Sequence, residues 1–430
     1  MVTKRIKFAF FIFILLSYCS FAQEINRNVV VVKPYEPSLS DAYKLSTLPR
    51  IEDTATISPE FNYSILPVRV DAPFDLKPIN AAKMVGVPLE KYYKSYLKLG
   101  LGNYYSTLAE YNINTLREKD HSLGFYFSHR ASNTKLKLDN ADKVPAGYSS
   151  NRLEGYANKY FPNTTLSGNA FFDYGVNHYY GYNTELFPDS FPLIKEKEIR
   201  QYFSTLGGDF RVYSTNVDST QPAYYLNFKP GYLWDRFKNT ESTIILEGGL
   251  KKLINQKEFG IDMVMDYAHS RLSSDSLTNS IVGGSPYFSK KNEEFEFLVG
   301  GRLFYGGEDE KFYVFPRAYL QINVVKNILM PYMGIDGSVT PGTYGRLVKK
   351  NPFIAPGSLM MNSDNLFVYG GIKGILSSKA GYNIGFSFDA VNDEPLFVND
   401  TVGELDNMFG VIHDDLAITK FRLKPGMIFQ

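Results

Sequence analysis

From residue 94 to residue 430, apolar and polar residues alternate in runs that are too long for ordinary soluble strands. The clearest run is 259–268, in which every second residue is large and apolar. Such a period of two places successive side chains on opposite faces of a β-strand. The runs are mostly ~9–13 residues long, whereas soluble strands average about 5–6 residues and membrane strands about 9–11. The pattern therefore predicts an all-β fold with unusually long strands.

Fifteen runs and one short tail account for most of this region. The runs are 95–104, 107–116, 122–130, 152–161, 166–176, 200–213, 224–234, 241–252, 259–268, 293–305, 312–324, 328–338, 365–377, 382–390 and 407–419, and the tail is 421–429. A membrane strand and its connection together take roughly 20 residues, so a region of this length holds about sixteen of them. We therefore predict an antiparallel transmembrane β-barrel of about 14–18 strands.

The overall composition fits two opposite faces averaged together. Mean hydropathy is −0.21, and no stretch after residue 22 approaches the ~18 consecutive apolar residues of a membrane helix. Barrel strands alternate lipid-facing and lumen-facing residues, so their mean hydropathy resembles that of a soluble protein. The 32 Tyr and 33 Phe, against a single Trp, would supply aromatic girdles at the two membrane interfaces.

Charge and cysteine content exclude several classes of protein. The 46 Lys and Arg residues nearly balance the 45 Asp and Glu residues, so a nucleic-acid partner is not expected. The lone Cys19 rules out a disulfide scaffold and a cysteine-ligated metal site. The five histidines are scattered without metal-binding spacing, and we predict neither a metal nor a cofactor.

No constellation of residues asks for catalysis. Asp262 and Asp266 share one face of a strand but lie about 13 Å apart at ~3.3 Å per residue. Glycosidases need two carboxylates roughly 5–9.5 Å apart, and no nucleophile elbow, phosphate loop or dinucleotide fingerprint is present. We therefore predict that the protein is not an enzyme, although an outer-membrane hydrolase stays formally open.

The N-terminus has the pattern of an export signal. Three basic residues precede the apolar run 8–16, and Ser20 and Ala22 occupy the −3 and −1 positions of a cleavage site. We expect cleavage near Ala22 and insertion among the lipids of an outer membrane. The rival signal, acylated at Cys19, is disfavoured because the bulky Tyr18 precedes the cysteine.

The chain thus divides into a signal peptide (1–22), a Pro-rich segment (23–93) and a barrel (94–430). The Pro-rich segment holds eight prolines and one glycine, while the other 33 glycines lie in the barrel region. Because proline fixes φ and cannot donate to a ladder, we expect 23–93 to be extended and to lie in the periplasm or lumen. It includes a short predicted strand with no neighbouring strand to pair with, and we predict that this strand binds a partner protein. The strand consists of Val29, Val30, Val31 and Val32.

The connections between runs fall into two sizes. The long polar ones are 131–150, 183–199, 270–286, 340–364 and 393–405, and the short ones include 117–121, 162–164, 254–258, 307–311 and 378–379. Short periplasmic turns and long external loops are typical of outer-membrane barrels. Strict alternation, however, places 340–364 on the periplasmic side. Either one hairpin in the second half is miscounted, or a long segment folds inward.

Charged residues occupy the polar phase of many strands. The candidates for lining the lumen are Asp209, Arg211, Asp262, Asp266, Glu296, Arg302 and Arg317. A lumen of mixed charge suits either a solvated wall of salt bridges or a conduit for small polar solutes. The sequence leaves both interpretations open.

Three stretches resemble exported proteins of Bacteroidetes-type Gram-negative bacteria. They are VVVVKPYEPSLSDAYKLSTLP, INAAKMVGVPLEKYYKSYLKLGLGNY and LSGNAFFDYGVNHYYGYN. The family they resemble is that of TonB-dependent-receptor-like outer-membrane barrels. The resemblance implies transport of small solutes. It also implies that Val29–Val32 is similar to the short apolar box that a periplasmic energy-transducing protein, TonB, grips as a strand.

The chain departs from that family in three places. Segment 23–93 is too short and too Pro-rich to be the globular plug of such a receptor. About sixteen strands also make a barrel smaller than the barrels of that family. The predicted last strand contains Pro425 and is followed by Gln430, so we expect a C-terminus that is truncated. The alternative function is a barrel that does not transport and that docks periplasmic or surface partners through 23–93 and the long loops.

Overall fold

The computed structural model describes residues 92–430, apart from 117, 139–140, 183, 185–193, 216–220, 274, 356, 358–359, 378, 401–406, 415 and 430. The predicted signal peptide, the strand Val29–Val32 and nearly all of the Pro-rich segment lie outside the described residues. Within the described part of the chain, no helix has the length and apolarity needed to cross a bilayer.

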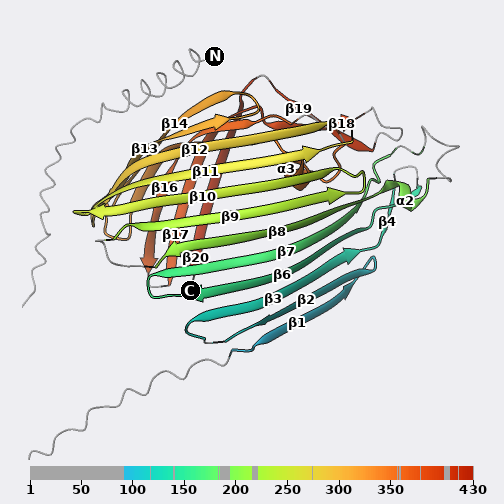
Figure 1. Ribbon diagram of the computed structural model, residues 1–430, viewed down its shortest axis with the longest axis horizontal. Coiled ribbons are helices and arrows are strands. Elements are labelled where there is room, and N and C mark those ends of the chain that lie inside the picture. Colours follow the sequence, from blue (N-terminus) through green and yellow to red (C-terminus); the bar gives the residue numbers. More distant parts are fainter. Residues whose placement is uncertain are drawn as a thin grey trace, which may run out of the picture. The chain divides into compact units, whose positions relative to one another are not determined.

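Sixteen long strands form one antiparallel sheet (Figure 1). In sheet order they are β1 (Ser95–Gly102), β2 (Ser106–Asn114), β3 (His121–Ser132), β6 (Tyr148–Tyr160), β7 (Thr164–His178), β8 (Arg200–Ser214), β9 (Ala223–Asp235), β10 (Thr240–Ile254), β11 (Lys257–Arg271), β12 (Ser276–Lys291), β13 (Phe295–Gly306), β14 (Lys311–Ile322), β15 (Met330–Thr340), β16 (Ser363–Ser377), β17 (Ala380–Asn392) and β20 (Ile418–Phe429). The order follows the chain, as in an up-and-down barrel. The predicted all-β fold of about 14–18 antiparallel strands is confirmed.

Two errors in the strand assignment cancel in that count. Residues 270–286, predicted as a loop, contain most of β12, and its turn-like Gly283, Gly284 and Pro286 lie inside a paired strand. The run 407–419 does not form one barrel strand. Its first part is β19 (Met408–His413), which pairs with β18 (Pro395–Asp400) in a separate hairpin. The sixteenth strand of the sheet is β20.

Adding β12 restores the alternation of the loops. The connections after β3, β7, β15 and β17 now all leave from the same end of the strands, and we call this end of the sheet the loop edge. They carry β4 (Lys135–Lys137), β5 (Lys143–Pro145), α2 (Glu196–Ile199), α3 (Tyr344–Lys350) and the β18–β19 hairpin. The other edge, the turn edge, carries short connections (Figure 1). The connection 340–364 therefore leaves the same edge as the other long loops, and the mismatch in the predicted alternation came from a miscounted hairpin, as one of the two explanations held.

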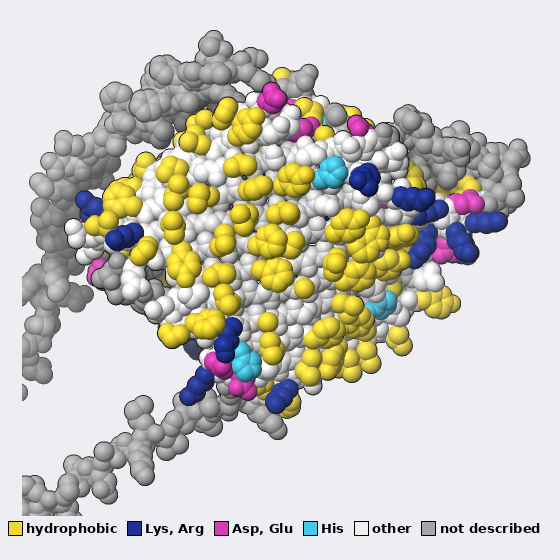
Figure 2. Space-filling view, in the orientation of Figure 1, with side chains coloured by type: hydrophobic (Ala, Val, Ile, Leu, Met, Phe, Trp, Pro, Cys, Tyr) yellow, Lys and Arg dark blue, Asp and Glu magenta, His cyan; other side chains and the backbone are white. Residues whose placement is uncertain are grey.

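One face of the sheet exposes large apolar side chains, which we call the outer face. Leu99, Met263 and Val299 on this face are each at least half exposed. Hydrophobic side chains spread over the strands, whereas charged side chains gather near the strand ends (Figure 2). An apolar surface of this extent would aggregate in water, and it matches the lipid-facing band of a membrane barrel.

The opposite, inner face carries aromatic rings that lie against glycines of neighbouring strands. A Cβ added to Gly334 would come within 2.5 Å of the Tyr369 ring, and one on Gly260 would overlap the Tyr287 ring. Only glycine leaves room for a ring to lie flat on the adjacent backbone. This arrangement keeps the inner wall thin and leaves the other side of each ring facing inward.

The sheet ends at β1 and β20, and among the described residues each of these strands is paired on one side. Pro425 lies in β20 opposite Ile384 of β17. An edge strand tolerates proline, because its missing N–H can point away from the ladder.

Candidate functional site

A ladder of ion pairs and hydrogen bonds crosses the inner face. Arg152 of β6 contacts Glu154 at 2.8 Å and Asp173 of β7 at 2.9 Å. Further along the sheet, Lys229 of β9 contacts Glu247 of β10 at 2.7 Å. These charges are mixed in sign, and each of these five residues has a partner on the same or an adjacent strand. The inner wall is therefore polar but close to neutral over short distances.

Two of the predicted lumen-lining residues border a cavity of about 300 Å³. Asp209 and Arg211 of β8 face it together with Glu154, Tyr156 and other residues of β6 and β7. The Arg211 Nε donates to Asn227 Oδ1 at 2.7 Å, and the Asp209 backbone N–H donates to Asn169 at 3.0 Å.

Two more of these residues, Glu296 and Arg317, border a second cavity of about 270 Å³ over β11–β16. Arg317 Nη1 lies 2.9 Å from Asp262 Oδ2, so the structure brings three predicted residues together here. Arg302 pairs with Asp336 at 2.7 Å beside the same cavity. Asp266 lies nearer the loop edge and pairs with Arg346 of α3. The predicted residues thus form three groups rather than one ring.

The β15–β16 connection folds inward across the barrel, and we call residues 341–362 the inward loop. The Tyr344 hydroxyl donates to Asp235 of β9 at 2.6 Å, and the Gly345 N–H donates to Glu241 of β10 at 3.0 Å. Arg346 pairs with Asp266 of β11. These strands stand several places away from β15 and β16 in the sheet. The sequence left two explanations for the broken alternation of the loops, a miscounted hairpin and a long segment that folds inward. The structure contains both.

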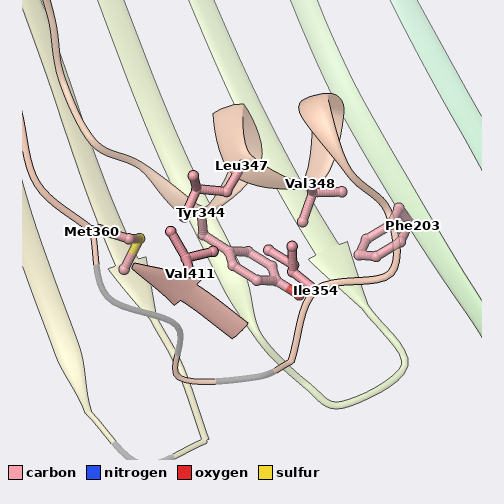
Figure 3. Close-up of a cluster of buried hydrophobic side chains, with 7 residues drawn as sticks. All are labelled: Phe203, Tyr344, Leu347, Val348, Ile354, Met360 and Val411. Atoms are coloured by element: carbon pink, nitrogen blue, oxygen red, sulfur yellow. The ribbon is translucent and has the colours of Figure 1, made fainter. Parts of the chain in front are cut away.

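Apolar side chains hold the inward loop in place. Its helix α3 and the residues after it pack against β8 and β19 in one buried cluster (Figure 3). The cluster consists of Phe203, Tyr344, Leu347, Val348, Ile354, Met360 and Val411. Burying side chains of this size contributes about 1.5–3 kcal/mol each relative to exposure. The loop is thus a packed structural element.

The neighbouring long loops join this packing. The Tyr179 hydroxyl, after β7, donates to the Pro352 carbonyl at 3.1 Å, and the Tyr179 ring lies 5.6 Å from Phe353. The Ala355 N–H donates to the Phe409 carbonyl of β19 at 2.8 Å. The connections after β7, β15 and β17 therefore close over one another at the loop edge.

Burial changes the proton affinity of groups in these loops. Burial, and then the nearby Asp235 carboxylate, raise the pKa of Tyr344 well above its ordinary value, so its hydroxyl stays a donor. Burial opposes ionisation of Glu394. Hydrogen bonds from Lys420 and the charge of Lys350 outweigh it and lower the pKa of Glu394. The loops are thus joined by groups whose protonation is fixed near neutral pH.

One group of potential metal ligands occurs among the described residues, in the exposed β2–β3 turn: Glu118, Asp120 and His121. Lys159 already binds Asp120 at 2.6 Å, and its hydrogen bond, together with that of His121, lowers the pKa of Asp120 to about 2. The turn therefore has a structural explanation without an ion.

The sequence did not identify the inward loop as part of the site, but a signal was present. Thr343 is an N-cap residue, and its side chain accepts a hydrogen bond from the Arg346 N–H. Tyr344, Leu347 and Val348 follow at helical spacing inside a connection predicted to be polar. A short amphipathic helix in a long barrel loop indicates a segment that buries one face.

The sequence matches no protein-family model, and no curated protein matches it. The fold is similar to several solved structures. The FrpB iron transporter from Neisseria meningitidis aligns with TM-score 0.55 and 10% identity, over 80% of this chain and 60% of that one. A ferric enterobactin receptor from Pseudomonas aeruginosa aligns with TM-score 0.51 and 9% identity, over 77% of this chain and 58% of that one. The copper transporter OprC aligns with TM-score 0.51 and 11% identity, over 78% of this chain and 58% of that one.

At this level of identity the similarity concerns the fold alone. The chain spans about 60% of the length of the solved structures it matches. The long antiparallel strands, the apolar outer face and the polar inner face agree with the alignment. The chain therefore has an outer-membrane β-barrel fold similar to that of these transporters and receptors.

Proposed function

We propose that this protein is an outer-membrane β-barrel through which small polar solutes pass, similar in type to TonB-dependent receptors of Bacteroidetes but without a plug. The observation that carries the proposal is the pair of opposite faces on one sheet. Large apolar side chains cover the outer face, whereas ion pairs and two polar cavities of about 270 and 300 Å³ lie on the inner face. A membrane-inserted wall around a water-filled interior satisfies both faces.

The inward loop gives this proposal a specific form. A loop that crosses the interior and packs on β8–β11 narrows the passage at the loop edge. Transport then requires that the loop move or that solutes fit beside it. Of the seven proposed lumen-lining residues, Asp266 contacts the inward loop, and the other six lie between this loop and the turn edge.

The proposed location and partners follow from the sequence. We place the barrel in the outer membrane after cleavage of the signal peptide near Ala22, with lipid around the outer face. We place residues 23–93, as an extended segment, in the periplasm or the lumen, and we propose that Val29–Val32 binds a TonB-type or scaffold protein by strand addition. The balanced charge of the chain does not favour a nucleic-acid partner, and the sequence holds no catalytic motif that would favour an enzyme.

The packing of the long loops also favours a second candidate function. A mouth filled by buried side chains and ion pairs suits a barrel that docks partners rather than one that conducts. In that case residues 23–93 and the loops would form the docking surfaces.

Two measurements test these functions. We expect the protein in the membrane fraction to migrate faster on gels when unheated, because folded barrels resist detergent. A soluble, heat-insensitive protein would contradict the barrel. Liposome swelling in neutral and charged solutes then separates the two functions. Swelling of the liposomes supports passage of solutes. Docking is supported if the liposomes do not swell and a partner co-purifies with the protein only when residues 23–93 are present.

A further inference from the structure

Tyrosine rings form the floor of the cavity of about 270 Å³ on the inner face. Tyr319 and Tyr369 line it, with ring centroids 6.4 Å apart and planes at 21°. The Tyr332 ring also lies 6.4 Å from the Tyr319 ring, measured between ring centroids. Because Tyr369 lies against Gly334, one ring face meets backbone and the other is left toward the interior. The rings therefore form a flat aromatic surface.

The protein's own cations already use this kind of surface. The Arg317 guanidinium lies 4.9 Å from the centre of the Tyr287 ring, and Lys373 Nζ lies 5.5 Å from that of Tyr332. The negative face of an aromatic ring attracts a cation within about 6 Å. No described Lys or Arg makes such a contact with Tyr319 or Tyr369, the two rings that line the cavity.

The charged residues around the cavity have the sign that suits a cation. Three carboxylates line it, Glu258, Glu296 and Asp336, against the single cation Arg317. Arg317 is engaged by Asp262 at 2.9 Å. Asp336 is paired with Arg302 at 2.7 Å, so Glu258 and Glu296 are the two carboxylates that would repel an anionic ligand and that a purely apolar ligand would leave desolvated.

Two of the three carboxylates can exchange partners at small cost. Glu296 is paired at 2.7 Å with Lys291, whose side chain is 74% exposed. Glu258 is paired at 3.2 Å with Lys251, whose side chain is 53% exposed. Pairs with such exposed lysines contribute little, because water and salt compete for both charges. An ammonium group in the cavity could therefore replace a lysine as the partner of either carboxylate.

We infer that this cavity binds a small organic ammonium cation, with its charged group over Tyr319 and Tyr369 and beside Glu296. The volume of about 270 Å³ is below the usual range for drug-sized ligands, so one ammonium head group fits better than a large cation. This inference deepens the proposed function by naming a class of solute, and it rests on the inner face being open to solutes.

The test compares choline with its neutral isostere, 3,3-dimethylbutan-1-ol, on the purified full chain in detergent. Isothermal titration should show choline binding at least tenfold more tightly than the isostere. Glu296→Gln and Tyr369→Leu should each weaken choline binding at least fivefold. Equal affinity for the two compounds, or no saturable binding of choline to heat-modifiable protein, would overturn the inference.

A matched control uses a second acid paired with an exposed lysine. Glu293 contacts Lys326 at 2.9 Å in the turn before β13 and does not line the cavity. Glu293→Gln should leave choline binding unchanged, and an equal loss in both Gln variants would contradict a specific site. Binding in detergent does not require passage. Choline binding without liposome swelling would refute only the proposed passage, and swelling without preference for choline would refute only the cation site.

Discussion

The inward loop should depend strongly on the pair between Arg346 and Asp266. The Asp266 side chain is only 12% exposed, and that of Arg346 is 31% exposed. Replacing Arg346 by Gln leaves a buried carboxylate without its cation, and removing one partner of a buried pair costs about 3–5 kcal/mol. Because Arg346 is partly exposed, we take the lower end, about 3 kcal/mol. Each 1.4 kcal/mol is a factor of ten, so the undocked fraction of the loop should rise roughly 100-fold.

Thiol labelling measures that fraction directly. In a Cys19→Ser background, Val348→Cys places one thiol in the buried cluster, where it reacts only when the loop undocks. We expect Arg346→Gln to speed labelling about 100-fold. Asp266→Asn should restore most of the protection, because it removes the orphaned charge. An unchanged labelling rate in folded Arg346→Gln protein would refute the docking geometry.

A control separates this effect from a general loss of stability. Lys326→Gln breaks an exposed ion pair at the turn edge, at 2.9 Å from Glu293, and should leave the labelling rate within twofold. Heat-modifiable migration of each variant shows that the barrel itself is folded. If Lys326→Gln sped labelling as much as Arg346→Gln, the loop would be reporting global unfolding.

Three further predictions concern other contacts. The folded-state pKa of Tyr344 lies above 10.0, so loop docking should be intact below pH 10 and weaken above it; near-UV circular dichroism should show this, and Tyr344→Phe should abolish it. The pKa of Glu394 is lowered, so its stabilisation is present above pH 4.5 and lost as pH falls further; Glu394→Gln should reduce the urea midpoint at pH 7 but not at low pH. Gly334→Ala should destabilise the barrel by about 1–3 kcal/mol in urea because its Cβ meets the Tyr369 ring, whereas Gly284→Ala, with open space, should be nearly neutral.

Strand type and facing were predictable from the sequence because they depend on local alternation. Met263 and Leu303 lie on the exposed face, as their runs require. Strand β12 was not recognised, because Gly283, Gly284 and Pro286 read as a turn in isolation. Gly283 accommodates the Phe304 ring of the next strand, and this contact between strands cannot be recognised from the neighbouring sequence.

The candidate site was predictable only in part. The polar phase of their strands groups Asp262 and Arg317 in the sequence, but their 2.9 Å contact joins β11 to β14, and strand order alone does not predict which side chains reach each other. Asp266, a predicted candidate for lining the lumen, pairs with Arg346 of the inward loop. Where a long loop packs depends on tertiary contacts such as Tyr344 with Asp235. Such contacts leave no periodic signal.

Single-channel recording in planar lipid bilayers tests the central claim most directly. Two refolded proteins would be compared, the full chain and a variant in which a short Gly-Ser linker replaces residues 343–361 of the inward loop. A polar passage narrowed by this loop predicts small or no steps for the full chain and stable, larger conductance for the variant. Equal conductance would show that the loop does not narrow the passage. No conductance from either protein, with both heat-modifiable, would contradict a passage through the barrel.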